Sequence, residues 1–141
     1  MLKFYNNNKI MYDEYLDYVA SVKWDRSSNL DILQSEDIIS PLSNKTIRNA
    51  LVNKVSITYE EEGAKVELLI MPLQINRIYK LTYSNVTSFN YPRKCFAVFN
   101  RIKFNELIVN KKHKYIHTFL FESGWILKIK SQEMFFELEQ I

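Results

Sequence analysis

Apolar and polar side chains alternate with a period of two over most of the chain after Val52. The turn residues Glu61-Glu62-Gly63 separate the first two runs, whose apolar positions are Val55, Ile57, Tyr59, Val66, Leu68 and Ile70. A period of two is typical of a β-strand, because successive side chains of a strand point to opposite faces of the sheet. The pattern therefore predicts a hairpin at this point and a sheet as the main structure of the chain.

Further runs with the composition of strands continue to the end of the sequence. They cover residues 79–83, 86–91, 96–109, 117–121, 125–129 and 134–138, and Ser123-Gly124 supplies a two-residue turn before Trp125. Parallel strands need crossover connections of about a dozen residues, and the runs are joined by shorter segments. We therefore expect an antiparallel meander, strongly twisted or bent into a half-barrel, of about seven to eight strands.

The first 51 residues have a different pattern, which predicts helices. Asn7 or Asn8 can cap a helix that continues through Tyr12–Ala20, where apolar residues recur at spacings of three and four. Short helices are also expected at Leu30–Gln34 and at Ile47–Leu51. The fold class expected is α+β, with N-terminal helices packed on the sheet. We predict one domain over residues 1–141, in which 1–51 are helical or irregular and 52–141 form the sheet.

The cysteine count, the apolar stretches and the net charge indicate the cellular compartment of the protein. Cys95 is the single cysteine, so no disulfide can form within the chain, which is typical of a reducing compartment. The longest apolar stretch, Leu68 to Pro72, is too short to cross a bilayer. These features predict a cytoplasmic protein without a membrane partner. The net charge of +3 is compatible with nucleic-acid contact but does not indicate it.

Residue types that carry catalysis are poorly placed in this sequence. With two glycines in the whole chain, the three-glycine dinucleotide motif is impossible, and the phosphate-binding loop motif is absent. His113 and His117 have the spacing of helical zinc ligands, with Cys95 as a third candidate. On the strand that we predict here, however, positions four apart are about 13 Å distant. We expect no metal, no cofactor and no enzyme activity.

Aromatic residues favour one alternative function. Phe, Tyr and Trp make up 14% of the chain and are concentrated in the predicted strands. On an exposed sheet face, Tyr79, Tyr83 and Tyr91 with neighbouring basic residues would form a stacking surface for single-stranded nucleic acid. The other interpretation is that these aromatics belong to the core, because half-buried strands favour them.

Three charged segments are candidates for binding a protein partner. Asp13, Glu14 and Asp17 lie on the predicted first helix, Glu60, Glu61 and Glu62 at the first hairpin turn, and Lys111 and Lys112 at a later one. Binding a protein requires anchors and a charged rim but no catalytic group. For each segment, the alternative is an ordinary solvated surface.

Two stretches of the chain carry a resemblance to a known group. Ser40-Pro41-Leu42-Ser43, followed by Ile47–Val55, is similar to a Leu-His-Asp-Ala-x-Leu-x-x-Ile pattern that leads into a first strand. Phe119–Ile129 is similar to a closing hairpin. Both patterns resemble those of small bacterial cytosolic immunity proteins of toxin systems, including contact-dependent growth inhibition. Arg48 and Asn49 replace the His-Asp pair, so no role of that pair is carried over.

The resemblance implies a function that depends on binding a partner and not on catalysis. A protein of this group is made beside a toxin, binds it tightly and blocks its active site or its access to substrate. The expected function is therefore stoichiometric neutralisation of a cognate bacterial protein toxin, and the alternative is a single-stranded nucleic-acid-binding module. Many nuclease toxins are basic, so local acidic patches would have to act despite the positive net charge.

Overall fold

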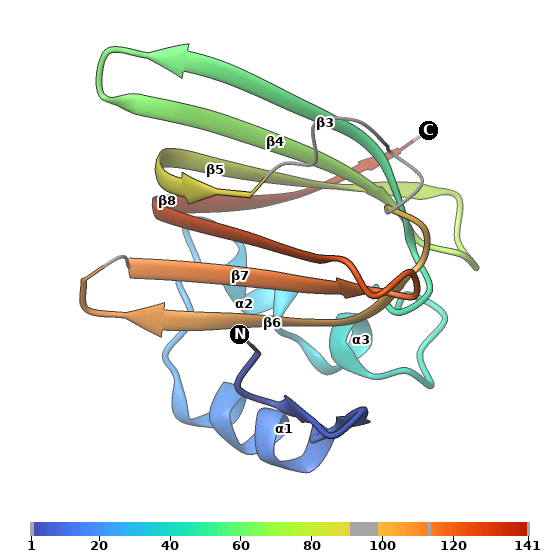
Figure 1. Cartoon of the computed structure of the whole chain (residues 1–141). Helices are drawn as coiled ribbons and strands as arrows, with labels where there is room; N and C mark the ends of the chain where they lie inside the picture. The colour runs from blue at the N-terminus through green and yellow to red at the C-terminus, as the bar shows by residue number, and fades with distance from the viewer. Residues whose placement is uncertain (1, 91–98, 113, 141) are drawn as a thin grey trace.

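A computed structural model describes residues 2–90, 99–112 and 114–140 of the chain. Its main element is a six-stranded antiparallel sheet, drawn in Figure 1. In spatial order the strands are β3 (Leu51–Glu60), β4 (Gly63–Met71), β5 (Arg77–Phe89), β8 (Ile126–Gln140), β7 (Lys114–Phe121) and β6 (Ile102–Asn110). The predicted antiparallel sheet and the hairpin around Glu61-Glu62-Gly63 are confirmed.

The sheet differs from the expected meander in strand number and in order. Two of the predicted runs form the single strand β5, and the last two runs form β8. β3, β4 and β5 follow one another as neighbours, as do β6, β7 and β8, but β5 pairs with β8 and not with β6. The sequence pattern could not reveal this order, because alternation fixes the face of each side chain and not the neighbour of each strand.

The sheet bends so far that its two edge strands approach each other at one end. Leu51 and Arg101 form an isolated antiparallel bridge beside the starts of β3 and β6. The N–H of Asn49 donates to the carbonyl of Ile102 at 2.8 Å, and the N–H of Ile102 donates to the carbonyl of Ala50 at 3.0 Å. Within the described residues the edges pair at this bridge alone, so the sheet does not close into a barrel.

The N-terminal segment begins with a small hairpin that the sequence did not predict. β1 (Tyr5–Asn6) pairs with β2 (Lys9–Ile10), and the turn between them contains Asn7 and Asn8 at φ angles of 52° and 60°. Asparagine tolerates this left-handed conformation, which tight hairpin turns require. The prediction that these asparagines cap the first helix is therefore wrong: α1 (Tyr12–Ser21) starts after Met11, without a side-chain cap.

Two further short helices follow, α2 (Leu30–Leu33) and α3 (Glu36–Ile39). The helix predicted at Ile47–Leu51 is wrong, because residues 47–49 form a bend and a turn and Leu51 already belongs to β3. Asn49 has a φ of 67°, which ends any helix, and its N–H is used by Ile102. No helix within the described part of the chain is long and apolar enough to cross a bilayer.

The buried side chains form two clusters. The larger one joins the inner face of the sheet to apolar side chains from α2, α3 and the turn before β3, including Leu30, Leu33, Ile38, Ile47 and Ala50. The smaller one joins Tyr15 and Val19 of α1 to Phe104 of β6 and Leu120 of β7. Side chains from both the helical part and the sheet therefore contribute to the core.

Candidate partner-binding surface

The interior of the sheet contains a polar network. The hydroxyl of Tyr83 lies 2.6 Å from Nδ1 of His117, and Nε2 of the same ring lies 3.0 Å from Oδ1 of Asn105. An amide oxygen can only accept, so Nε2 carries the proton and Nδ1 accepts from the tyrosine hydroxyl. These bonds satisfy both ring nitrogens of a histidine that has no exposed surface.

Burial keeps this histidine neutral. It lowers the pKa of His117 to about 3, and it raises the pKa of Tyr83 well above its ordinary value. Both side chains are fully covered, so the network rigidifies the core and offers no contact to a substrate. In the described ranges, no three His, Cys, Asp or Glu residues gather as metal ligands. His113 and Cys95 lie outside the described residues.

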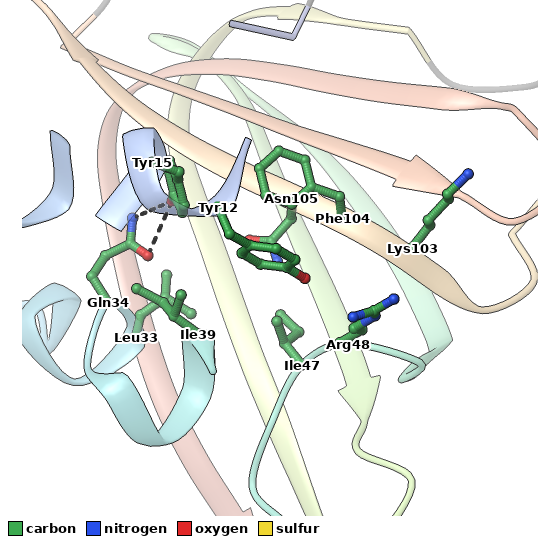
Figure 2. A pocket seen from close by; sticks show the side chains of 10 residues that line it. All are labelled: Tyr12, Tyr15, Leu33, Gln34, Ile39, Ile47, Arg48, Lys103, Phe104 and Asn105. Carbon is green, nitrogen blue, oxygen red and sulfur yellow. Dashed lines mark hydrogen bonds between the residues drawn. The ribbon is translucent and has the colours of Figure 1, made fainter. Parts of the chain in front are cut away.

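A narrow pocket marks the point where the helices meet β6 (Figure 2). It has a volume of about 10 Å³, roughly that of one water molecule. At its wall the Tyr15 hydroxyl donates to Oε1 of Gln34 at 3.3 Å and accepts from its Nε2 at 2.9 Å. The guanidinium of Arg48 lies 6.0 Å from the centre of the Tyr12 ring. This junction orients α1 relative to α2, and it is too small to hold a ligand.

The tyrosines proposed for base stacking are in the core. Tyr79 is 1% exposed and Tyr83 is fully buried, because odd-numbered positions of this part of β5 face inward. Tyr79 donates its hydroxyl hydrogen to the carbonyl of Lys45, and its ring packs edge-on against Phe136. The prediction that these two side chains stack on nucleic acid is therefore wrong. Tyr91 lies outside the described residues.

All of the predicted charged residues are exposed, but they do not form one surface. Asp13, Glu14 and Asp17 lie on the outer side of α1. Glu60, Glu61 and Glu62 are at the β3–β4 turn, and Lys111 and Lys112 are at the β6–β7 turn. Figure 1 shows both turns at the same end of the sheet, but they belong to opposite edges. The acidic turn, the basic turn and the α1 face are therefore three separate sites.

An apolar groove lies between α1 and α3, beside the acidic residues of α1. It has a volume of about 400 Å³, and its lining includes Leu16, Val19, Ala20, Ile39 and Pro41. Leu16 is 42% exposed although it is a large apolar side chain. At 100° per residue, Asp13 lies about 60° and Asp17 about 100° around the axis of α1 from Leu16, so both lie outside the lining of the groove. The acidic side chain that lines this groove is Glu36 of α3, and Asp13 and Asp17 lie on the neighbouring side of α1.

A second groove lies on the other side of α3, toward the ends of β5 and β8. It has a volume of about 360 Å³, and Ile32, Ile38, Ile75 and Leu138 line it. Ile32 is 40% exposed and Leu138 is 44% exposed. Exposed apolar side chains grouped in concave surface are typical of interaction sites, whereas scattered ones are not.

The short helix α3 separates the two grooves. Glu36 borders the first groove and Asp37 the second, and both side chains are exposed. Asp37 makes a long ion pair with Lys45 at 3.9 Å. We define the α3 surface as α3, the two grooves, and Asp13 and Asp17 of α1. It combines apolar concavities with acidic side chains, which is the composition of a docking site for a protein with basic residues around apolar anchors.

Comparisons with known proteins match this chain to no family model, to no curated protein and to no solved structure. The α3 surface is therefore interpreted from its own residues.

Sequence reasoning found only part of this surface. It identified Asp13 and Asp17, but it missed α3 and the exposed apolar residues Leu16, Ile32 and Leu138. One signal was available in Leu16, an apolar residue between two aspartates on the polar side of an amphipathic helix. The grooves themselves form between distant segments, so no local pattern indicates them.

Proposed function

We propose that this protein is an immunity-type inhibitor that binds one cognate bacterial protein toxin through the α3 surface and neutralises it by stoichiometric occlusion. The observation that carries the proposal is the pair of apolar grooves on either side of the acidic helix α3. Such grooves accept apolar anchors from a partner, and the surrounding carboxylates attract a basic rim.

The local charge supports a basic partner although the whole chain is positive. The α3 surface includes four exposed acidic residues, Asp13, Asp17, Glu36 and Asp37. In the second groove, Lys45 pairs with Asp37. Arg77 also lines the second groove. Electrostatic steering depends on the charges near the contact more than on the net charge, because salt screens separations beyond about 10 Å.

The alternative function, binding of single-stranded nucleic acid, has less support. Its stacking surface required exposed tyrosines on β5, and Tyr79 and Tyr83 are in the core. A labelled oligonucleotide at low salt is therefore a useful control, and we expect no change in its fluorescence anisotropy.

The test is co-expression of this protein with the polypeptide encoded beside its gene. We expect a one-to-one complex with nanomolar affinity, and loss of the toxin's activity that is complete when the two proteins are equimolar. Inhibition at far lower molar ratios would indicate an enzyme that inactivates the toxin, and it would contradict occlusion. Absence of a complex with the neighbouring polypeptide would contradict the proposed partner.

A further inference from the structure

The two edges of the sheet differ in the hydrogen bonding of their outward-facing backbone groups. At β6 the hydroxyls of Tyr15 and Tyr18 accept hydrogen bonds from the outward N–H groups of Leu107 and Val109, at 3.0 and 2.8 Å. At the other edge, β3 pairs within the described part of the chain with β4 alone, apart from the bridge at Leu51. Phe99 lies beside residues 52–55 of β3, with which it lines a small pocket. Unpaired backbone groups of an edge strand are open to pairing with another strand.

The register of the β3–β4 hairpin determines which groups face outward. Glu60 and Gly63 are paired across a two-residue turn, so they exchange both backbone hydrogen bonds. The same holds for every second residue of β3, which places Thr58 opposite Lys65 and Ser56 opposite Glu67 in hydrogen-bonded pairs. The intervening residues, Val55, Ile57 and Tyr59, therefore direct their N–H and C=O groups to the open edge.

The regular part of this edge is self-complementary. An irregularity between Val52 and Lys54 interrupts the register, so regular pairing extends over residues 54–60. Lys54 and Glu60 lie at equal distances on either side of Ile57, and their side chains point to the same face. Antiparallel pairing of two copies about Ile57 places Lys54 opposite Glu60 of the second copy, at both ends of the contact.

The backbone and the other side chains fit this register. Ile57 would face Ile57 of the second copy as a hydrogen-bonded pair, in agreement with the outward direction of its N–H and C=O. Val55 would face Tyr59 of the second copy, and a β-branched residue opposite an aromatic one is a favourable cross-strand pair. Tyr59 is 85% exposed, so this pairing would cover a large apolar side chain.

We propose that β3 is a self-association edge, through which two copies of this chain join their sheets by antiparallel pairing about Ile57. The occupant is a second copy because the charge pattern of the edge complements itself. This surface is separate from the α3 surface, so the proposal does not depend on the toxin-binding function.

Sedimentation equilibrium of the purified chain and four variants tests the charge pairing. We expect a reversible monomer–dimer equilibrium for the wild type, and dissociation constants about tenfold weaker for Lys54→Glu and for Glu60→Lys. The double variant Lys54→Glu/Glu60→Lys restores the pairs and returns to within about threefold of wild type. Lys111→Glu, which reverses an exposed lysine at the other edge, is the matched control and has no effect. A wild type that is monomeric at all concentrations would overturn the proposal.

Amide hydrogen exchange on the wild type tests the backbone register without any substitution. The amides of Val55, Ile57 and Tyr59 should become protected as the concentration rises through the dimer range. Those of Ser56, Thr58 and Glu60, which already donate to β4, should change little. A dimer in which the outward amides keep their monomer exchange rates would place the interface elsewhere and refute the assignment to β3.

Discussion

The phenolic oxygen of Tyr15 accepts a hydrogen bond from the backbone N–H of Leu107 at 3.0 Å and so joins α1 to the edge strand β6. The same hydroxyl bonds to Gln34 directly after α2. One buried oxygen therefore connects three segments that are far apart in the sequence and sets the position of α1 beside the first groove.

Removing this oxygen tests the connection. Tyr15→Phe leaves the N–H of Leu107 without a partner in a fully buried position, and we expect a loss of about 1–3 kcal/mol in the free energy of unfolding. Tyr18→Phe is the matched control, because the Tyr18 hydroxyl accepts from Val109 at an exposed site where water can replace it. Urea denaturation measures both variants. Equal losses in the two variants would show that the buried Tyr15 hydroxyl contributes no more to stability than the exposed Tyr18 hydroxyl.

His117 predicts a decline of stability in acid. Burial lowers its pKa to about 3 in the folded protein, below its ordinary value of 6.5, so the unfolded chain binds the proton more readily. The contribution of the neutral ring is fully present above pH 6.5 and is lost as the pH falls toward 3, with a slope that approaches about 1.4 kcal/mol per pH unit. Denaturant unfolding across this range should show the slope in the wild type but not in His117→Gln. An unchanged slope in the variant would exclude the histidine as its source.

Glu106 predicts a smaller effect of opposite sign. Its carboxylate is buried and accepts the N–H groups of Lys3 at 2.7 Å and Phe4 at 3.0 Å, and desolvation raises its pKa above the ordinary value of 4.5. The folded protein therefore binds this proton more readily than the unfolded chain does. Relative to Glu106→Gln, the wild type should gain stability as the pH falls through the raised pKa, and the gain should level off below 4.5. A difference that is constant with pH would contradict the buried carboxylate.

The acidic residues of the α3 surface predict a kinetic effect on toxin binding. Asp13→Lys and Asp17→Lys reverse exposed charges on α1, on the side next to the residues of this helix that line the first groove. We expect the association rate to fall about tenfold at low salt, a weaker salt dependence, and a nearly unchanged dissociation rate. Surface plasmon resonance separates the two rates. If Glu61→Lys at the β3–β4 turn has the larger effect, the acidic turn and not α1 attracts the toxin.

The sequence predicted the strands well and their arrangement poorly. The alternation around Glu61-Glu62-Gly63 and around Ser123-Gly124 predicted two hairpins, because period and turn chemistry are local properties. The predicted two-residue length of the second turn is wrong, because residues 122–124 lie between Phe121 and Trp125, whose backbones are hydrogen-bonded. The pairing of β5 with β8 joins segments about forty residues apart or more, and no local pattern encodes it. Asn7 and Asn8 were interpreted as helix caps, although the same residue type also favours the left-handed turn that they form.

The candidate site shows the same division. Asp13 and Asp17 were predicted as surface residues from the polar face of a helix, which is a local signal. For Tyr79 and Tyr83 the sequence left two interpretations open, an exposed stacking face or the core, because alternation does not say which of two faces a partner element covers. Burial by α2, α3 and the turn before β3 decides that question, and it depends on tertiary contacts.

The most direct test of the central claim is calorimetric titration of the toxin with a variant in the first groove. Leu16→Glu changes an exposed side chain that lines this groove and should leave the fold intact. We predict that it weakens toxin binding by at least about tenfold, because an apolar side chain of the toxin would be placed against the new carboxylate in the groove. Lys111→Glu/Lys112→Glu, at the β6–β7 turn, should bind within about twofold of wild type. Full affinity for Leu16→Glu together with loss of binding for the lysine variant would contradict docking on the α3 surface.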